Sequence, residues 1–431
     1  MDQLDDDFVF ITHEDAGEVM SAEPEHLREI SDFVNSIAYD LWAVNKTIHD
    51  NPELGFQEFI AHETLTKCMA SRPGWNVTPS AYGMATAWVA VFDSGKKGPV
   101  VSFNVEMDAL EGIGHACGHN LIATASVAGG LATAEILKQH KLGGKVVLFG
   151  TPAEEGGGGK IKLLRAGAYR DHKVDISLLS HPGITKNHAL MRTSAYTAFK
   201  VEYFGREAHA AASPWLGINA LDALVTAYNA ISVLRQQTMP GDVIQGNITD
   251  GGVRPNIIHA YTAGNFVVRA NTQARLSELK KKVDACFEAA ASATGATLKM
   301  TPVQSYADHV PNRVLADHYR RYFNQLCPPE LIPSNPEVDD IQGRTTASTD
   351  QGDISYAMPS LNVSFSIPPG PGGAGPHNPG FAKAAGTKFA FERCLRVGKA
   401  MAGVGFDILE NPSLLEDVKR EWRKDIKGEY A

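Results

Sequence analysis

Apolar side chains recur at spacings of three and four between Pro24 and Ile48, which predicts an amphipathic helix that begins at the proline. A second helical pattern covers Phe59–Ser71. The chain then alternates between strand-like and helical patterns, with strands expected at 85–92 and 100–105, a helix of small residues at 121–140 and an apolar strand at 145–150. This alternation favours an α/β sheet with helices on its faces.

The pattern changes near Met191 and the α/β alternation resumes after about Ser305. Between them the order is strand, helix, two strands, helix and strand, at 195–205, 217–236, 242–249, 259–270, 275–294 and 297–304. That order is typical of a ferredoxin-like unit. We therefore expect one α/β domain over 24–190 and 306–431, interrupted by a ferredoxin-like α+β insertion at 191–305. An acidic, flexible tail is expected at 1–23.

The composition of the chain excludes several classes of binding partner. The chain has 431 residues, 43% of them hydrophobic, and a net charge of −9, which makes nucleic acid an improbable ligand because both would be anionic. No apolar run approaches the roughly 20 residues that span a bilayer, so no membrane partner is expected. The five cysteines form no CxxC pair and the first residues lack the order of a signal peptide. A cytoplasmic location is the expectation.

A first group of candidate ligands follows the apolar strand Val100–Val105, in the segment Glu106–Asn120. Cys117 and His119 offer a thiolate and an imidazole two residues apart, and both suit zinc-like ions. Open α/β sheets place their sites at such carboxyl ends of strands. A buried cysteine beside histidines in a glycine-rich loop is the structural alternative.

A second group, Glu154 and Glu155, follows the strand Val146–Gly150. Adjacent side chains in an extended segment point to opposite sides, so one carboxylate could bind a metal while the other faces a water. A metal that acidifies water, together with a carboxylate base, is what hydrolysis requires. The alternative is a solvated acidic loop. The glycines before Lys160 do not have the spacing of a phosphate-binding loop.

Further candidates lie at two strand ends and in the insertion. His181 follows the strand Ile176–Leu179, and His377 follows a Pro/Gly-rich loop. Within the insertion, His209 lies in a loop of small residues, while Arg254 and Asn256 share a turn between two strands. Arginine offers a planar fork that suits a carboxylate. Each of these residues could equally be an ordinary loop residue.

Taken together and in this order, the groups resemble the di-metal aminoacylase/carboxypeptidase family of metallopeptidases. The similarity is greatest to the branch of aminobenzoyl-glutamate hydrolase, auxin-conjugate amidohydrolases and β-alanyl-lysine dipeptidase. It covers about residues 25–405. The matching segments are 49–55 with Glu58, 108–110, 115–120, 152–155, 205–210, 251–256, 348–350 and 377–379.

The resemblance implies a role for each candidate. It makes Glu154 the general base, gives Asp108 an orienting role, and assigns His209 to the oxyanion of a neighbouring subunit's site. Asn256 and Arg254 would hold the substrate. The implied ligands of two divalent ions, zinc or manganese with cobalt as a further candidate, are Cys117, His119, Glu155, His181 and His377. The insertion becomes a lid and dimerisation domain, and the protein a homodimer.

The expected activity is metal-dependent hydrolysis of an amide or peptide bond in a dipeptide or N-acyl amino acid. Three alternatives stay open at this point. The same site could form amide bonds in a biosynthetic pathway, or the fold could be a catalytically silent metal-binding scaffold. A cysteine hydrolase using Cys117 would survive chelation and be inactivated by alkylation, whereas a metal site predicts loss of activity with chelators.

Overall fold

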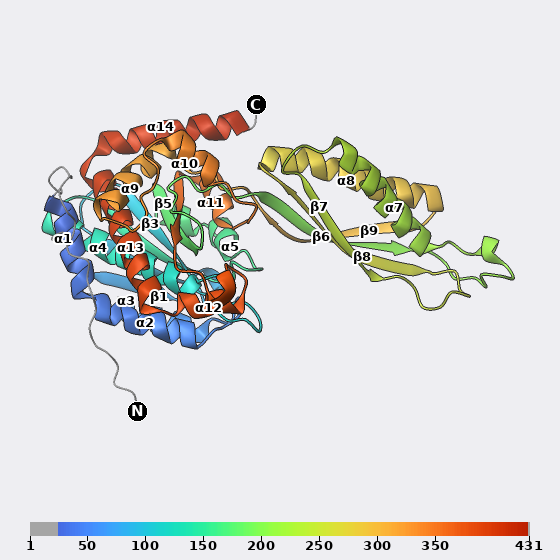
Figure 1. Cartoon of the computed structure of the whole chain (residues 1–431), viewed down its shortest axis with the longest axis horizontal. Helices are drawn as coiled ribbons and strands as arrows, with labels where there is room; N and C mark the ends of the chain where they lie inside the picture. Colours follow the sequence, from blue (N-terminus) through green and yellow to red (C-terminus); the bar gives the residue numbers. More distant parts are fainter. Residues whose placement is uncertain (1–24, 430–431) are drawn as a thin grey trace. The chain divides into compact units, whose positions relative to one another are not determined.

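The computed structural model describes residues 25–429, so the tail predicted at 1–23 lies outside the described residues. The chain forms two compact units, coloured along the sequence in Figure 1. Of the described residues, unit 1 comprises 25–192 together with Val310–Arg344 and Asp353–Ile426. Unit 2 comprises Thr193–His309, Thr345–Gly352 and the described residues 427–429.

Unit 1 is built on a six-stranded mixed sheet in the order β1-β2-β4-β3-β5-β10. Strands β4, β3, β5 and β10 pair in parallel, while β2 runs opposite to both of its neighbours. The carboxyl ends of the parallel strands therefore meet at one edge. The strands are β1 (Trp75–Pro79), β2 (Trp88–Asp93), β3 (Val100–Glu106), β4 (Lys145–Thr151), β5 (Ile176–Gly183) and β10 (Ser360–Ser366).

Both faces of this sheet are covered, and for that reason β3 is buried at every position. Phe103 and Leu148 belong to a core shared with the long helices α4 (His119–Gln139) and α13 (Lys388–Glu410). The opposite face packs on the short helices α5 (Gly159–Arg165) and α6 (Ala168–Asp171). The other described helices of this part of the chain are α1 (Glu25–Ser36), α2 (Ala38–Asp50), α3 (Phe59–Ala70), α9 (Arg313–Gln325), α10 (Pro336–Gln342), α11 (Gln351–Ala357), α12 (Pro379–Ala385) and α14 (Pro412–Glu429).

Helix α4 is the central helix of unit 1. It packs closely on the sheet because Gly129 and Gly130 lack side chains: a Cβ would lie 2.9 Å from the ring of Phe103 or 2.4 Å from Leu148. The helix is long and apolar enough to cross a membrane by composition, but 94% of its most apolar window is buried inside the protein. Those features are typical of a core helix.

The single helix predicted from Pro24 to Ile48 is wrong in one respect, because the structure has two helices there. Ile37 separates α1 from α2 with φ −106° and ψ 4°. Val34, Ile37 and Leu41 are all buried. The change of direction keeps the apolar side chains on both sides of the break in one core.

Unit 2 has the strand and helix order predicted for a ferredoxin-like insertion. Its antiparallel sheet has the order β7-β8-β6-β9. Helices α7 and α8 bury apolar residues against this sheet, with the rings of Phe199, Phe266 and Phe287 in contact. The elements are β6 (Ala195–Phe204), α7 (Ala220–Leu234), β7 (Val243–Asp250), β8 (Tyr261–Ala270), α8 (Gln273–Thr294) and β9 (Thr297–Tyr306).

Candidate metal centre

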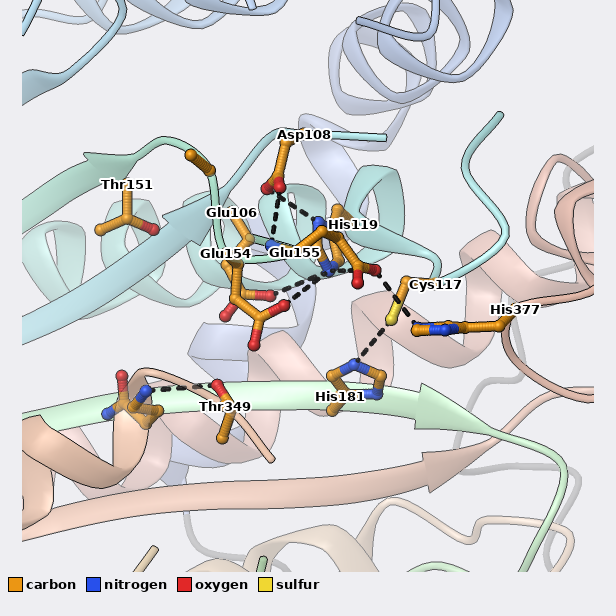
Figure 2. A network of polar contacts seen from close by, with 12 residues as sticks. Glu106, Asp108, Cys117, His119, Thr151, Glu154, Glu155, His181, Thr349 and His377 are labelled. Atoms are coloured by element: carbon orange, nitrogen blue, oxygen red, sulfur yellow. Dashed lines mark hydrogen bonds and ion pairs between the residues drawn. The ribbon is translucent and has the colours of Figure 1, made fainter. Parts of the chain in front are cut away.

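Three neighbouring parallel strands of unit 1 deliver the polar residues predicted from the sequence to one edge of the sheet. Strand β3 ends two residues before Asp108, and β4 ends three residues before Glu154. His181 lies near the carboxyl end of β5. Because β3 pairs with both β4 and β5, these side chains converge, as Figure 2 shows.

The backbone is shaped to bring the remaining candidates to the same place. Gly118, between Cys117 and His119, has φ +80°, and a Cβ there would lie 2.5 Å from Pro182. His377 adopts φ +63° shortly before α12. Left-handed backbone at a residue other than glycine is unfavourable and is often found at functional sites.

Five side chains place atoms that can bind a metal at the spacing of metal ligands. Sγ of Cys117 is 3.3 Å from Nε2 of His181, and Nε2 of His377 is 3.4 Å from Oε1 of Glu155. That same Glu155 oxygen is 3.8 Å from Nε2 of His119. Within unit 1, three groups each have their ligand atoms within 4.8 Å of one another: Cys117 with His119 and His181, Cys117 with Glu155 and His377, and His119 with Glu154 and Glu155.

Asp108 fixes the orientation of two of these groups. Its Oδ1 lies 3.1 Å from Nδ1 of His119, and its Oδ2 accepts a hydrogen bond from the backbone N–H of Glu155 at 2.9 Å. A carboxylate partner keeps the proton of His119 on Nδ1, which leaves the lone pair of Nε2 available to bind an ion. His181 is held similarly, because its Nδ1 donates to the carbonyl of Pro182 at 2.8 Å.

Burial and charge set the protonation of the group. Burial would raise the pKa of Asp108, but His119 and the backbone N–H groups of Glu154 and Glu155 together outweigh it and hold that pKa below its usual value. For His119, burial is outweighed chiefly by the neighbouring Asp108 carboxylate, and its pKa is raised well above normal. Burial lowers the pKa of His181 and raises that of the Cys117 thiol well above its usual value, with Glu155 raising the latter further. By itself, Cys117 is therefore a poor free nucleophile, which disfavours the cysteine-hydrolase alternative.

These residues fit a pair of divalent ions. Nε2 of His119 and Oε1 of Glu155 are buried atoms with no hydrogen-bond partner among the described residues. Buried polar atoms normally have a hydrogen-bond partner. Two buried atoms that face one another without such a partner, and whose lone pairs can bind a metal, indicate a cation site. The mixture of one thiolate, three imidazoles and a carboxylate suits zinc and related transition metals.

The sequence-predicted residues fall into two sets. Unit 1 brings together all seven of the candidates that the sequence places in its domain: Asp108, Cys117, His119, Glu154, Glu155, His181 and His377. Sequence reasoning overlooked Glu106 and Lys160, whose side chains form an ion pair at 2.6 Å with neither exposed to solvent. The signal in the sequence that could have found Glu106 was its position as a charged residue at the end of the apolar strand β3.

The other set lies in two adjoining loops of unit 2. His209 and Ile257 form an isolated β-bridge between those loops, and Ala210 N donates to the carbonyl of Asn256 at 3.0 Å. Nδ1 of His209 accepts the backbone N–H groups of Ala211 and Ala212. The neutral imidazole of His209 therefore carries its proton on Nε2, and this N–H can donate a hydrogen bond.

Comparison with known proteins identifies the family of this chain. Residues 100–392 match the family described as "Peptidase family M20/M25/M40". The Xaa-Arg dipeptidase of Mus musculus is 37% identical over 425 residues, covering 96% of both chains. One of the two p-aminobenzoyl-glutamate hydrolase chains of Escherichia coli is 31% identical over 324 residues, covering 71% of this chain and 66% of its own.

A solved structure supports the same fold. A Bacillus subtilis protein described as a dinuclear metal binding peptidase aligns with a TM-score of 0.64 at 18% identity, over 87% of this chain and 99% of its own. The sequence matches support hydrolysis rather than a silent scaffold or amide synthesis. The chain therefore belongs to peptidase family M20/M25/M40 and is a metal-dependent hydrolase of amide bonds.

Proposed function

We propose that this protein cleaves dipeptides or N-acyl amino acids with two divalent ions held by Cys117, His119, Glu155, His181 and His377. The observation that carries the proposal is the convergence of these donors around the unsatisfied Nε2 of His119. The donor set favours zinc, and manganese or cobalt would suit the carboxylate. Divalent ions at these positions would polarise the scissile carbonyl and acidify the attacking water.

Glu154 acts as general base and then general acid. Its Oε2 lies 3.8 Å from Nε2 of His119, close to the proposed ions, and its side chain is 8% exposed. A carboxylate there is positioned to take a proton from the attacking water and to deliver it to the nitrogen of the leaving amine. Asp108 contributes by holding His119 and Glu155 in place, as its two hydrogen bonds indicate.

Substrate binding is completed by unit 2 of a second copy of the chain. The protonated Nε2 of His209 is suited to stabilise the oxyanion, while Asn256 and the guanidinium of Arg254 hold the substrate carboxylate. All three side chains are exposed and accessible to a second copy. Homodimerisation through unit 2 is supported by the exposed apolar residues of α7, Val225, Tyr228 and Val233.

The names of the relatives guide the choice of substrates. Proteins called Xaa-Arg dipeptidase, p-aminobenzoyl-glutamate hydrolase and IAA-amino acid hydrolase share one feature: their names point to an amide bond to an amino acid. A small-molecule amide that bears a free carboxylate is accordingly the proposed substrate. The five cysteines form no disulfide, which supports a reducing compartment such as the cytoplasm.

The first test joins metal content to turnover. Purified protein is analysed by plasma mass spectrometry and is offered Xaa-Arg and other dipeptides, N-acyl amino acids and p-aminobenzoyl-glutamate. Two ions per chain, with chelator-sensitive release of a free amino acid, are expected. Absence of bound metal after reconstitution with zinc, manganese and cobalt would contradict the proposal. Light scattering at micromolar concentration tests the dimer, for which a monomer mass is the contrary result.

A further inference from the structure

A fully buried ion pair lies beside the metal centre and has no role in the mechanism described so far. Glu106 is the last residue of β3, and Lys160 lies in the first turn of α5. Nζ of Lys160 is 2.6 Å from Oε1 of Glu106, and neither side chain is exposed. Removing two charges from water is unfavourable, so an apolar pair would serve packing alone at least as well.

The second oxygen of Glu106 faces a metal ligand. Oε2 lies 3.4 Å from Nε2 of His119, and both atoms are buried with no hydrogen-bond partner among the described residues. Figure 2 shows Glu106 beside Glu154 and His119, within the same group of polar side chains. Two ligand atoms that bind one ion at about 2.1 Å lie roughly 3.4 Å apart in a tetrahedral arrangement. The distance therefore suits two atoms that share an ion.

A buried carboxylate elsewhere in unit 1 shows what a purely structural role looks like. Oδ1 of Asp339 lies 2.9 Å from Nδ1 of His188, and its Oδ2 accepts the backbone N–H groups of Ala189 and Leu190. Both oxygens of Asp339 are thus satisfied by the protein, and its side chain is unexposed. Glu106 has one oxygen anchored by Lys160 and leaves the other directed at the metal centre.

We propose that Glu106 is a further carboxylate ligand of the ion at His119, with Lys160 anchoring its other oxygen. This inference rests on the two-ion site proposed above. Lys160 restrains the rotation of the carboxylate, so that Oε2 is placed before the ion arrives. It also brings a positive charge to a group that contains Asp108, Glu154 and Glu155. The pair would thereby set the affinity of one of the two ions.

The decisive experiment measures metal affinity of the full-length apoprotein rather than activity. Zn²⁺ is titrated calorimetrically in the presence of a competing chelator into wild type, Glu106→Gln and the matched control Asp339→Asn. Glu106→Gln is expected to weaken one of the two ions by about 10- to 100-fold and to leave the other unchanged. Asp339→Asn is expected to lower the melting temperature without changing either affinity.

Two further variants separate a ligand from a support of the fold. Lys160→Met keeps the charge on Glu106 and is expected to weaken the ion less than Glu106→Gln does. Glu106→Asp keeps the charge opposite Lys160 but withdraws the oxygen by one methylene, so it tests the inference even if the glutamine variant does not fold. Its expected result is selective weakening of the same ion, together with a changed visible spectrum of the Co²⁺-loaded protein.

The outcomes are distinguishable. Wild-type protein that binds fewer than two ions would overturn the proposed function and this inference with it. Wild-type protein that binds two ions, while both Glu106 variants retain wild-type affinity, would overturn the inference alone. Equal weakening by Lys160→Met and Glu106→Gln would also overturn it, because a merely structural pair predicts that result.

Discussion

The two groups of candidate functional residues differ in how firmly the protein holds them. In unit 1, Asp108 and His119 are buried and lie 3.1 Å apart, Asp108 just after the buried strand β3 and His119 at the start of helix α4. In unit 2, His209, Arg254 and Asn256 are exposed on loops between secondary-structure elements. The groups proposed to hold ions are thus mostly enclosed by the protein, with His377 as the exposed exception, whereas the groups proposed to bind the substrate are left accessible.

The difference has a consequence for mutagenesis. A change in the buried set removes a partner from a neighbouring buried charge, so metal affinity or stability should change together with activity. A change in the exposed set removes a contact proposed to form only with substrate, so it should affect activity alone. Each prediction below measures both kinds of effect.

The largest effect is expected for Glu154→Gln. Replacing the proposed base with a neutral isostere should lower kcat by about 10²- to 10⁴-fold, because proton transfer loses its acceptor, while both ions stay bound. Glu111→Gln is the matched control, since Glu111 is an exposed acid in the loop that precedes Cys117. Steady-state kinetics and metal analysis check the prediction. Normal turnover by the Glu154 variant would exclude it as the base.

His209→Ala should lower kcat by about 10²- to 10³-fold through loss of the proposed hydrogen-bond donor to the oxyanion. Its melting temperature and metal content should match wild type, because the side chain is exposed. Mixing this variant with Glu154→Gln tests whether the residue acts in a partner's site. After subunit exchange in a twofold dimer, up to about a quarter of wild-type activity should return. Given the loss of activity in His209→Ala alone, no recovery despite demonstrated exchange would place His209 and Glu154 in the same subunit's site.

Much of the fold could be predicted because its signals are local. Strand β3 was evident from its mainly apolar residues at 100–105, where Ser102 and Asn104 are the only polar interruptions, and every position of the strand is buried because both faces of the sheet are covered. The edge strand β1 was overlooked, since Trp75–Pro79 is at most half-buried and contains a proline. The break at Ile37 was also overlooked, because the helical spacing of apolar residues continues across it.

The site was predictable only where residue type alone carries the chemistry. Cys117 with His119, and the Glu154–Glu155 pair, stand out because few structural roles require those residues at strand ends. Glu106 did not stand out, since an acid at the end of a strand is ordinary. Its partner Lys160 is 54 positions away, and only the pairing of β3 with β4, which precedes α5, brings the two together.

Asp108→Asn should have a smaller effect than either catalytic change. An amide cannot keep the proton of His119 on Nδ1 as a carboxylate does, so metal affinity is expected to fall by about 10- to 100-fold. The melting temperature should fall as well, because a buried partner of both His119 and Glu155 is altered. Excess metal should restore most of kcat. Recovery of metal occupancy without activity would instead indicate a direct chemical role for Asp108.

The smallest effect is expected for Arg254→Ala, at the exposed end of the comparison. Loss of a charge-assisted contact with the substrate carboxylate should raise KM by about 10-fold or somewhat more, with kcat little changed. Arg254→Lys keeps the charge but not the planar fork, so its KM should be intermediate. Metal affinity and melting temperature should stay at wild-type values in both variants.

A substrate that lacks the carboxylate should abolish the difference in KM between these variants and wild type, since the contact that distinguishes them would be missing. If the KM effect persisted with that substrate, Arg254 would act on the shape of the loop rather than on the ligand. Arg254 would then no longer be an example of an exposed residue that acts only by contacting the substrate, in contrast to the preformed buried centre.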